Sequence, residues 1–273
     1  MSFEIVDSKN SQPLWVPVSE TAEMFAGSID QWDTDTGGVE VLGVASGAYD
    51  TNNDSIIGGL VIGTSNETKV FEDGTTVGGT FRGEEITGVV SQANLLARTQ
   101  IGNRGMYKKG EKMAMVEHII LDVTTRLRGR VYNATYGTAL TVLTVTTAST
   151  DGGRTNTYIT NASDLASVPN ESTIFCRSGA NAGLYRVLST TSTTTHLNDV
   201  SFPFTIAVGD TFVMVPQQQG YSRIQVDAES TFINGAAITS YYGVFIDKMD
   251  LRIAGEESIE FRFIGNHFGF KTT

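Results

Sequence analysis

Short strand-like runs separated by turn clusters constrain this chain more than any other feature. The runs are rich in Val, Ile, Thr, Tyr and Phe, which suit a pleated sheet, and Gly (29) far outnumbers Pro (5). The clusters DTDTGG (33–38), FEDGTT (71–76) and STDGG (149–153) lie between such runs, and Gly, Asn and Asp tolerate turn conformations. Turns at this spacing predict an all-β fold, a barrel or sandwich scaffold with little helix.

Alternation is clearest in GVFIDKMDLRIAGEESIEFRFIG, residues 243–265. Apolar residues alternate with charged ones on both sides of the AGEE turn; they are Met249, Leu251, Ile253, Ile259, Phe261 and Phe263. A period of two places these residues on one face of a strand. The stretch predicts a β-hairpin with one buried face and one charged face.

The domain organisation follows from where the composition changes. Residues 1–40 form an N-terminal arm, and residues 41–137 and 218–273 form a β scaffold. Residues 138–217 are a Thr-rich block with loop-like flanks, and we expect them to be an inserted small β-barrel domain. Within the block, apolar residues shift face between Val142 and Leu143, which predicts a bulge near Leu143.

Charge and cysteine content exclude several classes of protein. The net charge of −11 argues against nucleic-acid binding, which needs clustered Lys and Arg. Cys176 is the only cysteine among 273 residues, so an internal disulfide or a cysteine-based zinc site is excluded. The chain has no apolar run of signal-peptide or membrane-span length. We expect a protein made in a cytoplasm, without a membrane partner.

A basic island interrupts the acidic chain. Residues 1–97 carry a charge of −12, residues 98–130 carry +5, and residues 131–273 carry −4. In the ambiguous stretch 111–131 we expect a strand up to about Leu121, followed by arginines that alternate as in a strand: Arg126, Arg128 and Arg130. These arginines are predicted to contact an acidic partner surface. Internal pairing with carboxylates such as Glu84, Glu85 and Asp122 is the alternative.

No pattern of catalytic or metal-binding residues stands out. His118, His196 and His267 lie at no metal-ligand spacing, and GVASG (43–47) lacks the Gly-x-Ser-x-Gly order of a nucleophile elbow. A calcium loop begins at Asp50 but fails at the required glycine and at the final glutamate. SGANAG (178–183) lacks the lysine of a phosphate loop and predicts a hairpin turn instead. We therefore predict no enzyme activity, no catalytic residues, no metal and no cofactor.

Two segments carry a resemblance to known proteins. IFCRSGANAGLYRVL (174–188) followed by VSFPFTIAVGDTFVMVP (200–216) resembles small β-barrel modules in structural proteins of tailed double-stranded-DNA bacteriophages. FAGSIDQWDTDTGGVEVLGVASGAYDTNNDSIIGGLVIGT (25–64) is similar to the β module of phage capsid decoration, or cement, proteins. The resemblance implies a virion protein on the capsid surface whose partner is the major capsid protein. It also implies a homo-oligomer, with a trimer favoured and a dimer as the alternative.

Two other functions stay open at this point. One is a head–tail connector or tail structural protein, and the other is a polysaccharide-binding β protein, which needs exposed aromatics beside a carboxylate pair. We add three aromatic residues to the candidate interface: Trp15 in the arm, and Phe268 and Phe270, which have few residues after them to cover them.

Overall fold

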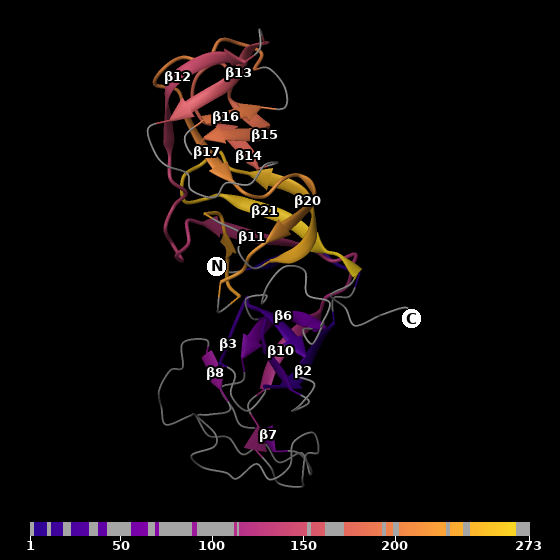
Figure 1. The fold of residues 1–273 in the computed structure, drawn as a ribbon. Helices are drawn as coiled ribbons and strands as arrows, with labels where there is room; N and C mark the ends of the chain where they lie inside the picture. Colours follow the sequence, from indigo (N-terminus) through magenta and orange to yellow (C-terminus); the bar gives the residue numbers. More distant parts are fainter. Residues whose placement is uncertain are drawn as a thin grey trace. The chain divides into compact units, whose positions relative to one another are not determined.

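The computed structural model is all-β, as the sequence predicts (Figure 1). It describes residues 3–9, 12–18, 23–32, 38–42, 56–64, 69–70, 89–91, 112–113, 115–151, 154–161, 172–192, 195–198, 202–227, 230–236 and 241–265. These residues form strands and turns with essentially no helix. No helix in the described part is long and apolar enough to span a membrane.

The chain divides into two compact units. Unit 1 contains Met1–Gly129, Val226–Thr231 and Arg262–Thr273, and unit 2 contains Arg130–Gln225 and Phe232–Phe261. The strands up to β10 belong to unit 1: β1 (Glu4–Asp7), β2 (Pro13–Pro17), β3 (Glu23–Phe25), β4 (Ile29–Trp32), β5 (Val39–Val41), β6 (Ile56–Thr64), β7 (Lys69–Val70), β8 (Val89–Ser91), β9 (Lys112–Met113) and β10 (Met115–Ile120). The remaining strands are β11 (Arg126–Tyr132), β12 (Leu143–Asp151), β13 (Arg154–Asn161), β14 (Thr173–Cys176), β15 (Gly183–Ser192), β16 (Thr195–Asn198), β17 (Thr211–Val215), β18 (Gly220–Ile224), β19 (Ile233–Asn234), β20 (Tyr242–Asp250) and β21 (Ser258–Phe263).

Unit 1 is built on an antiparallel sheet with strand order β2-β10-β6-β4-β5. Strands β10 and β11 confirm that the stretch 111–131 is extended on both sides of a turn. Five valines of this sheet make one apolar cluster. Four lie on strands β2, β5, β6 and β10, and one follows β2; they are Val16, Val39, Val61, Val116 and Val18. β-branched side chains of this kind pack well on a pleated surface, which is why the runs rich in valine form this sheet.

A second sheet has the strand path β1-β11-β21-β20-β18, and the short strand β19 pairs in parallel with β11. The predicted hairpin is confirmed as β20 and β21, with Met249, Ile259 and Phe261 buried. One part of that prediction is wrong, because Ile253 lies in the turn between the strands and is 62% exposed. The alternation continues one residue past the end of the strand, to the fully buried Leu251, and is lost in the turn.

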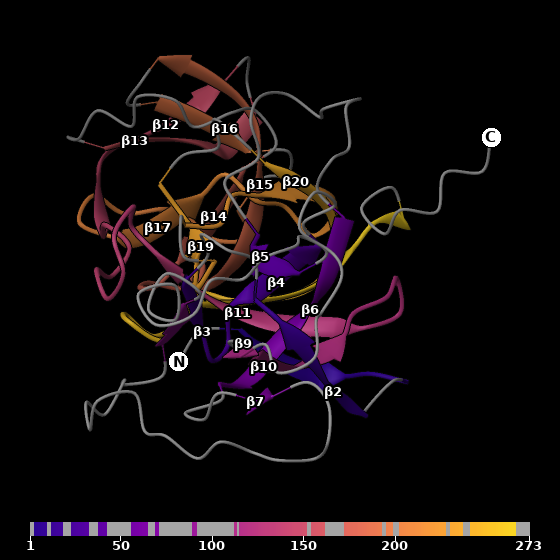
Figure 2. The same cartoon turned by 90° about the horizontal axis from the view of Figure 1, so that it is seen from below.

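A small closed barrel follows the order β12-β13-β16-β15-β14-β17 (Figures 1 and 2). Its interior is one apolar cluster made of Leu143, Val145, Ile174, Cys176, Val187, Phe202, Ile206, Phe212 and Met214. The pairing of β12 with β13 shifts register twice, between Val145 and Thr147 and between Ser149 and Asp151, and neither shift lies at Leu143, where the sequence predicts a bulge. The reason is that β12 begins at Leu143, opposite Phe212, so Val142 precedes the ladder and is exposed. The proposed boundaries at residues 138 and 217 stay a prediction.

Candidate interaction surface on the barrel

The loop SGANAG does form a hairpin turn, between β14 and β15, where Cys176 pairs with Gly183. Gly179 has φ +78°, a left-handed conformation that favours glycine. A Cβ atom at Gly179 would lie 2.6 Å from Oδ1 of Asp210, so this position also needs the space. Asp210 closes a second turn, because its Oδ2 accepts a hydrogen bond from the backbone N–H of Ala207 at 3.0 Å. The two turns therefore lie against each other.

Asn181 ties this loop to a third segment. Its side chain is buried, its Nδ2 donates to the Phe204 carbonyl at 2.9 Å, and its Oδ1 accepts from the Phe204 N–H at 2.9 Å. Both backbone groups of Phe204 are thus paired with one side chain. Phe202 and Ile206 are buried in the barrel core, whereas Phe204 between them is 57% exposed.

We call residues 178–184 and 202–210 together the turn cluster. Its exposed side chains are mostly small or apolar: Ala180, Ala182, Leu184, Pro203, Phe204, Ala207 and Val208. Val208 is 70% exposed. Asp210 is the only charged residue in these two segments, and its carboxylate accepts the bond from Ala207. A rigid, exposed and uncharged surface in a chain of net charge −11 is suited to apolar contact with another macromolecule.

The buried thiol next to the turn cluster is unreactive. Cys176 faces the barrel interior, and burial together with the negative charge of Asp210 raises the pKa of its thiol to about 12. Because the thiolate is the reactive form, Cys176 serves the barrel as an apolar side chain.

Two of the three predicted interface arginines pair with carboxylates of their own chain. In unit 1, Nη1 of Arg128 lies 2.9 Å from Oε1 of Glu4, and in unit 2, Nη1 of Arg130 lies 2.6 Å from Oε2 of Glu256. The Nε of Arg126 is buried and has no hydrogen-bond partner among the described residues. These pairs are partly exposed and worth little on their own. The contact of the arginines with a partner stays a prediction.

Of the internal partners considered for the arginines, Glu84 and Glu85 lie outside the described residues. Asp122 caps the turn between β10 and β11 instead, where its Oδ1 accepts hydrogen bonds from the backbone N–H groups of Thr124 and Thr125 at 2.7 and 2.8 Å. Partial burial acts to raise the pKa of Asp122, but the hydrogen bonds from Thr124 and Thr125 outweigh it and the pKa is lowered.

The three aromatic candidates are placed only in part. Trp15 lies on β2 opposite Glu117, and its side chain is 41% exposed. Phe268 and Phe270 lie outside the described residues, as do residues 50–55 at the start of the calcium-loop sequence, whose remaining positions lie in β6.

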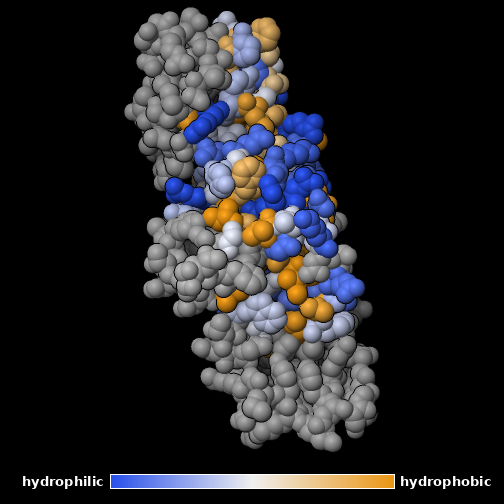
Figure 3. All heavy atoms as spheres, turned by 90° about the vertical axis from the view of Figure 1, so that its right-hand side faces the viewer, coloured by the Kyte–Doolittle hydropathy of each residue, from blue (hydrophilic) through white to orange (hydrophobic). Residues whose placement is uncertain are grey.

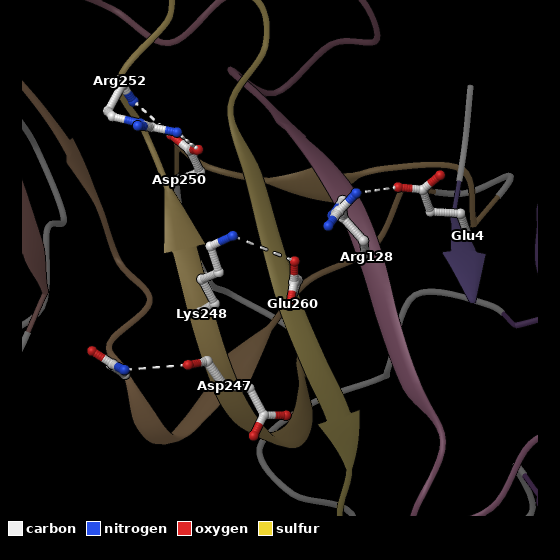
Figure 4. Close-up of polar contacts among 8 residues, drawn as sticks. Glu4, Arg128, Asp247, Lys248, Asp250, Arg252 and Glu260 are labelled. Atoms are coloured by element: carbon white, nitrogen blue, oxygen red, sulfur yellow. Dashed lines mark hydrogen bonds and ion pairs between the residues drawn. The ribbon is translucent and has the colours of Figure 1, made fainter. Parts of the chain in front are cut away.

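Hydrophilic side chains gather at the level of β20 and β21 (Figure 3). Figure 4 shows the ion pairs on this hairpin: Lys248 with Glu260 at 3.8 Å, and Arg252 with Asp250 at 2.5 Å. The hydrogen bond from Arg252 lowers the pKa of Asp250. This charged hairpin face differs from the turn cluster in that its side chains already have oppositely charged partners within the chain.

A buried His–Asp pair in unit 1 was missed by the sequence analysis. Nδ1 of His118 lies 2.8 Å from Oδ2 of Asp30, and both side chains are fully buried. Oδ1 of Asp30 accepts from the Gly59 N–H at 2.7 Å, and the Trp32 ring packs edge-on against the imidazole. With no exposed atom at either side chain, the pair is placed to stabilise the sheet. In the part of the chain that the structure describes, no group of three or more His, Cys, Asp or Glu could hold a metal ion.

The fold thus defines an all-β protein with a small closed barrel and an uncharged, rigid turn cluster. Comparison with known proteins adds no relative: no family model, no curated protein and no solved structure matches this chain.

Proposed function

We propose that this chain is a structural protein of a tailed-phage virion, a capsid decoration protein that binds the outer surface of the head and stabilises the shell. The observation that carries the proposal is the turn cluster. Its residues belong to the two segments that resemble phage barrel modules. Asn181 fixes the backbone of Phe204. The side chains of Phe204 and Val208 are both exposed.

Rigidity matters because binding orders the groups that make the contact. A side chain held in place before binding loses less conformational entropy, so more of its contact energy remains as affinity. At Phe204 the backbone that carries the ring is held in this way, since Asn181 binds both its N–H and its carbonyl. The partner we propose is the major capsid protein, which would present an apolar surface to the turn cluster.

A decoration protein stabilises a shell because its binding is thermodynamically coupled to the assembly of the shell. Any molecule that binds the intact shell and not its separated subunits shifts the equilibrium toward the intact shell. Repeated over many sites, modest contacts of this kind hold a shell together against internal pressure. We further propose that the chain acts as a homo-oligomer, either a trimer or a dimer, and that it is made in the host cytoplasm before it joins the virion.

The copy number in purified particles tests this function. Hundreds of copies per particle, measured by quantitative mass spectrometry, are expected for decoration. A few copies, as in a single ring at one vertex, would instead indicate a connector or tail protein and would overturn the proposal.

Binding to heads that lack the chain then tests the turn cluster. Phe204→Ser combined with Val208→Ser should abolish binding and lower the temperature at which heads release DNA to that of undecorated heads. Ile253→Ser is the matched control, because Ile253 is also exposed and lies in a turn outside the cluster. Normal binding by the Phe204/Val208 variant would show that another surface contacts the shell.

A further inference from the structure

The edge of the second sheet carries an exposed group of aromatic and arginine side chains within unit 2. On β18, Tyr221 packs edge-to-face on Phe245 of β20, with ring centroids 5.3 Å apart. Two residues along β18, the guanidinium carbon of Arg223 lies 4.6 Å from the ring centroid of Tyr241. We call these four residues the aromatic edge. Tyr and Arg are the residue types enriched where protein interfaces concentrate their binding energy.

Tyr221 is 75% exposed although it is packed against a neighbour, so its position is set while most of its ring stays accessible. On the same strand Ile224 is fully buried, which orients the strand firmly in its sheet. Tyr221 and Arg223 are two residues apart and therefore project from the same face. The edge thus presents a fixed aromatic ring next to a fixed cation.

The backbone of β18 is open on one side. In the described part of the chain, β18 is the last strand of its sheet and pairs only with β20. The side-chain Nε2 of Gln218 donates to the Tyr221 carbonyl at 3.1 Å. We infer from this contact that the carbonyl points away from β20. In an antiparallel strand, residues two positions apart direct their backbone groups to the same side. The N–H and carbonyl of Arg223 therefore point to the same side as those of Tyr221. Gln218 occupies the place where the N–H of another strand would bind.

We propose that β18 pairs with β18 of a second copy of this chain, antiparallel and about a two-fold axis at Ser222. In this register Tyr221 of each copy lies opposite Arg223 of the other. Their backbone groups can bond, and each guanidinium meets an aromatic ring, a favourable cross-strand pair that the symmetry repeats. The side chain of Gln218 is displaced when the second strand arrives.

Charge favours a second copy at this edge over other parts of the surface. Each copy has a net charge of −11, so two copies repel over most orientations. The aromatic edge contains one cation, Arg223, and no carboxylate. Approach through this edge brings an arginine of each copy toward the aromatic face of the other. Gln218 acts in the monomer as a cap that limits pairing with unrelated strands.

Self-association of the purified chain, measured by sedimentation velocity without any phage particle, tests the inference. Wild type should form a dimer, and Tyr221→Ser or Arg223→Glu should each raise the dimer Kd by about 30-fold, as for other residues on which binding depends strongly. Gln218→Ala should lower the Kd, because it removes a competitor for the Tyr221 carbonyl. Tyr136→Ser and Arg186→Glu are matched controls at exposed positions outside the edge.

A swap variant separates the proposed pairing from general loss of packing. Tyr221→Arg combined with Arg223→Tyr recreates the Tyr–Arg pairs across the two-fold axis, so this variant should dimerise more tightly than Arg223→Glu. Circular dichroism confirms that each variant is folded. A wild-type chain that stays monomeric at its highest soluble concentration, a trimer, or an unchanged Kd for Arg223→Glu would overturn the inference. None of these outcomes depends on whether the chain binds heads, so the proposed function is judged separately.

Discussion

The charged hairpin face and the turn cluster are both exposed surfaces of unit 2, yet they are built in opposite ways. On the hairpin, Arg252 and Asp250 satisfy each other in solvent. In the turn cluster, a buried amide on Asn181 holds an exposed phenyl ring on Phe204. Solvated ion pairs cost little to form and contribute little to stability. In the turn cluster both polar atoms of the buried amide are hydrogen-bonded, so the same contacts stabilise the loop and hold Phe204 at the surface.

The largest expected effect on stability comes from a buried ion pair between Arg177 and Glu257, in contrast to the more exposed ion pairs of the hairpin. Nη2 of Arg177, at the end of β14, bonds to Oε1 of Glu257, whose side chain is fully buried, and the Arg177 Nε donates to the Leu251 carbonyl at 3.0 Å. Arg177→Met should lower the free energy of unfolding by about 3–5 kcal/mol, because it leaves a buried carboxylate without its cation. Chemical denaturation measures this change.

A second variant controls for the packing of Arg177. Arg177→Met combined with Glu257→Leu removes both charges and should recover most of the stability. If the single variant unfolds at the wild-type denaturant concentration, the buried pair does not hold the barrel against the hairpin turn.

The next effect tests the turn cluster directly. Asn181→Ala should lower the free energy of unfolding by about 2 kcal/mol, because the N–H and the carbonyl of Phe204 both lose their partner. It should also free the 202–206 segment, so protease cleavage at Phe204 should become faster than in wild type. Asn181→Asp keeps an acceptor for the Phe204 N–H, but it replaces the donor with a buried, charged oxygen that faces the Phe204 carbonyl, so it should not restore the wild-type stability. Equal cleavage rates in Asn181→Ala and wild type would contradict a rigid cluster.

The smallest effect is expected on the charged hairpin face. The lowered pKa of Asp250 means that its contribution to stability is present above the unfolded pKa, near 3.8, and is lost as the pH falls through the folded value. Asp250→Asn should therefore change stability less than either variant above at neutral pH and should make no difference below the folded pKa. Melting temperatures from pH 7 down to pH 2 measure this. A larger loss than that of Asn181→Ala would reverse the contrast between the two surfaces.

Local patterns predicted much of the fold. Alternation in residues 243–265 predicts β20 and β21, because a side chain's face within a strand depends only on its position along the strand. Gly and Asn at 179–183 predict a hairpin because the turn needs a positive φ there. The same reasoning failed at Ile253 and at Val142, where the strand had already ended or had not begun, since the ends of a ladder depend on its partner strand.

Contacts between residues far apart in the chain were not predictable in this way. Asp30 and His118 are 88 residues apart, and Arg177 and Glu257 are 80 apart. Neither pair belongs to a local motif, and each forms only because strand pairing brings the two elements together. The turn cluster was likewise not predicted as an interface. A run of arginines is visible in the sequence as a charge pattern, whereas an uncharged surface assembled from two separate segments leaves no such pattern.

By itself, the sequence determined the all-β class, the turns and the alternating faces of the hairpin. These depend on backbone conformations and side-chain periods that act over a few residues. The tertiary structure alone decided that the barrel closes between β12 and β17, that Asn181 reaches Phe204, and that Tyr221 remains exposed at the edge of a sheet. Closure, buried hydrogen bonds and open edges depend on which strands become neighbours, and many distant interactions contribute to that choice together.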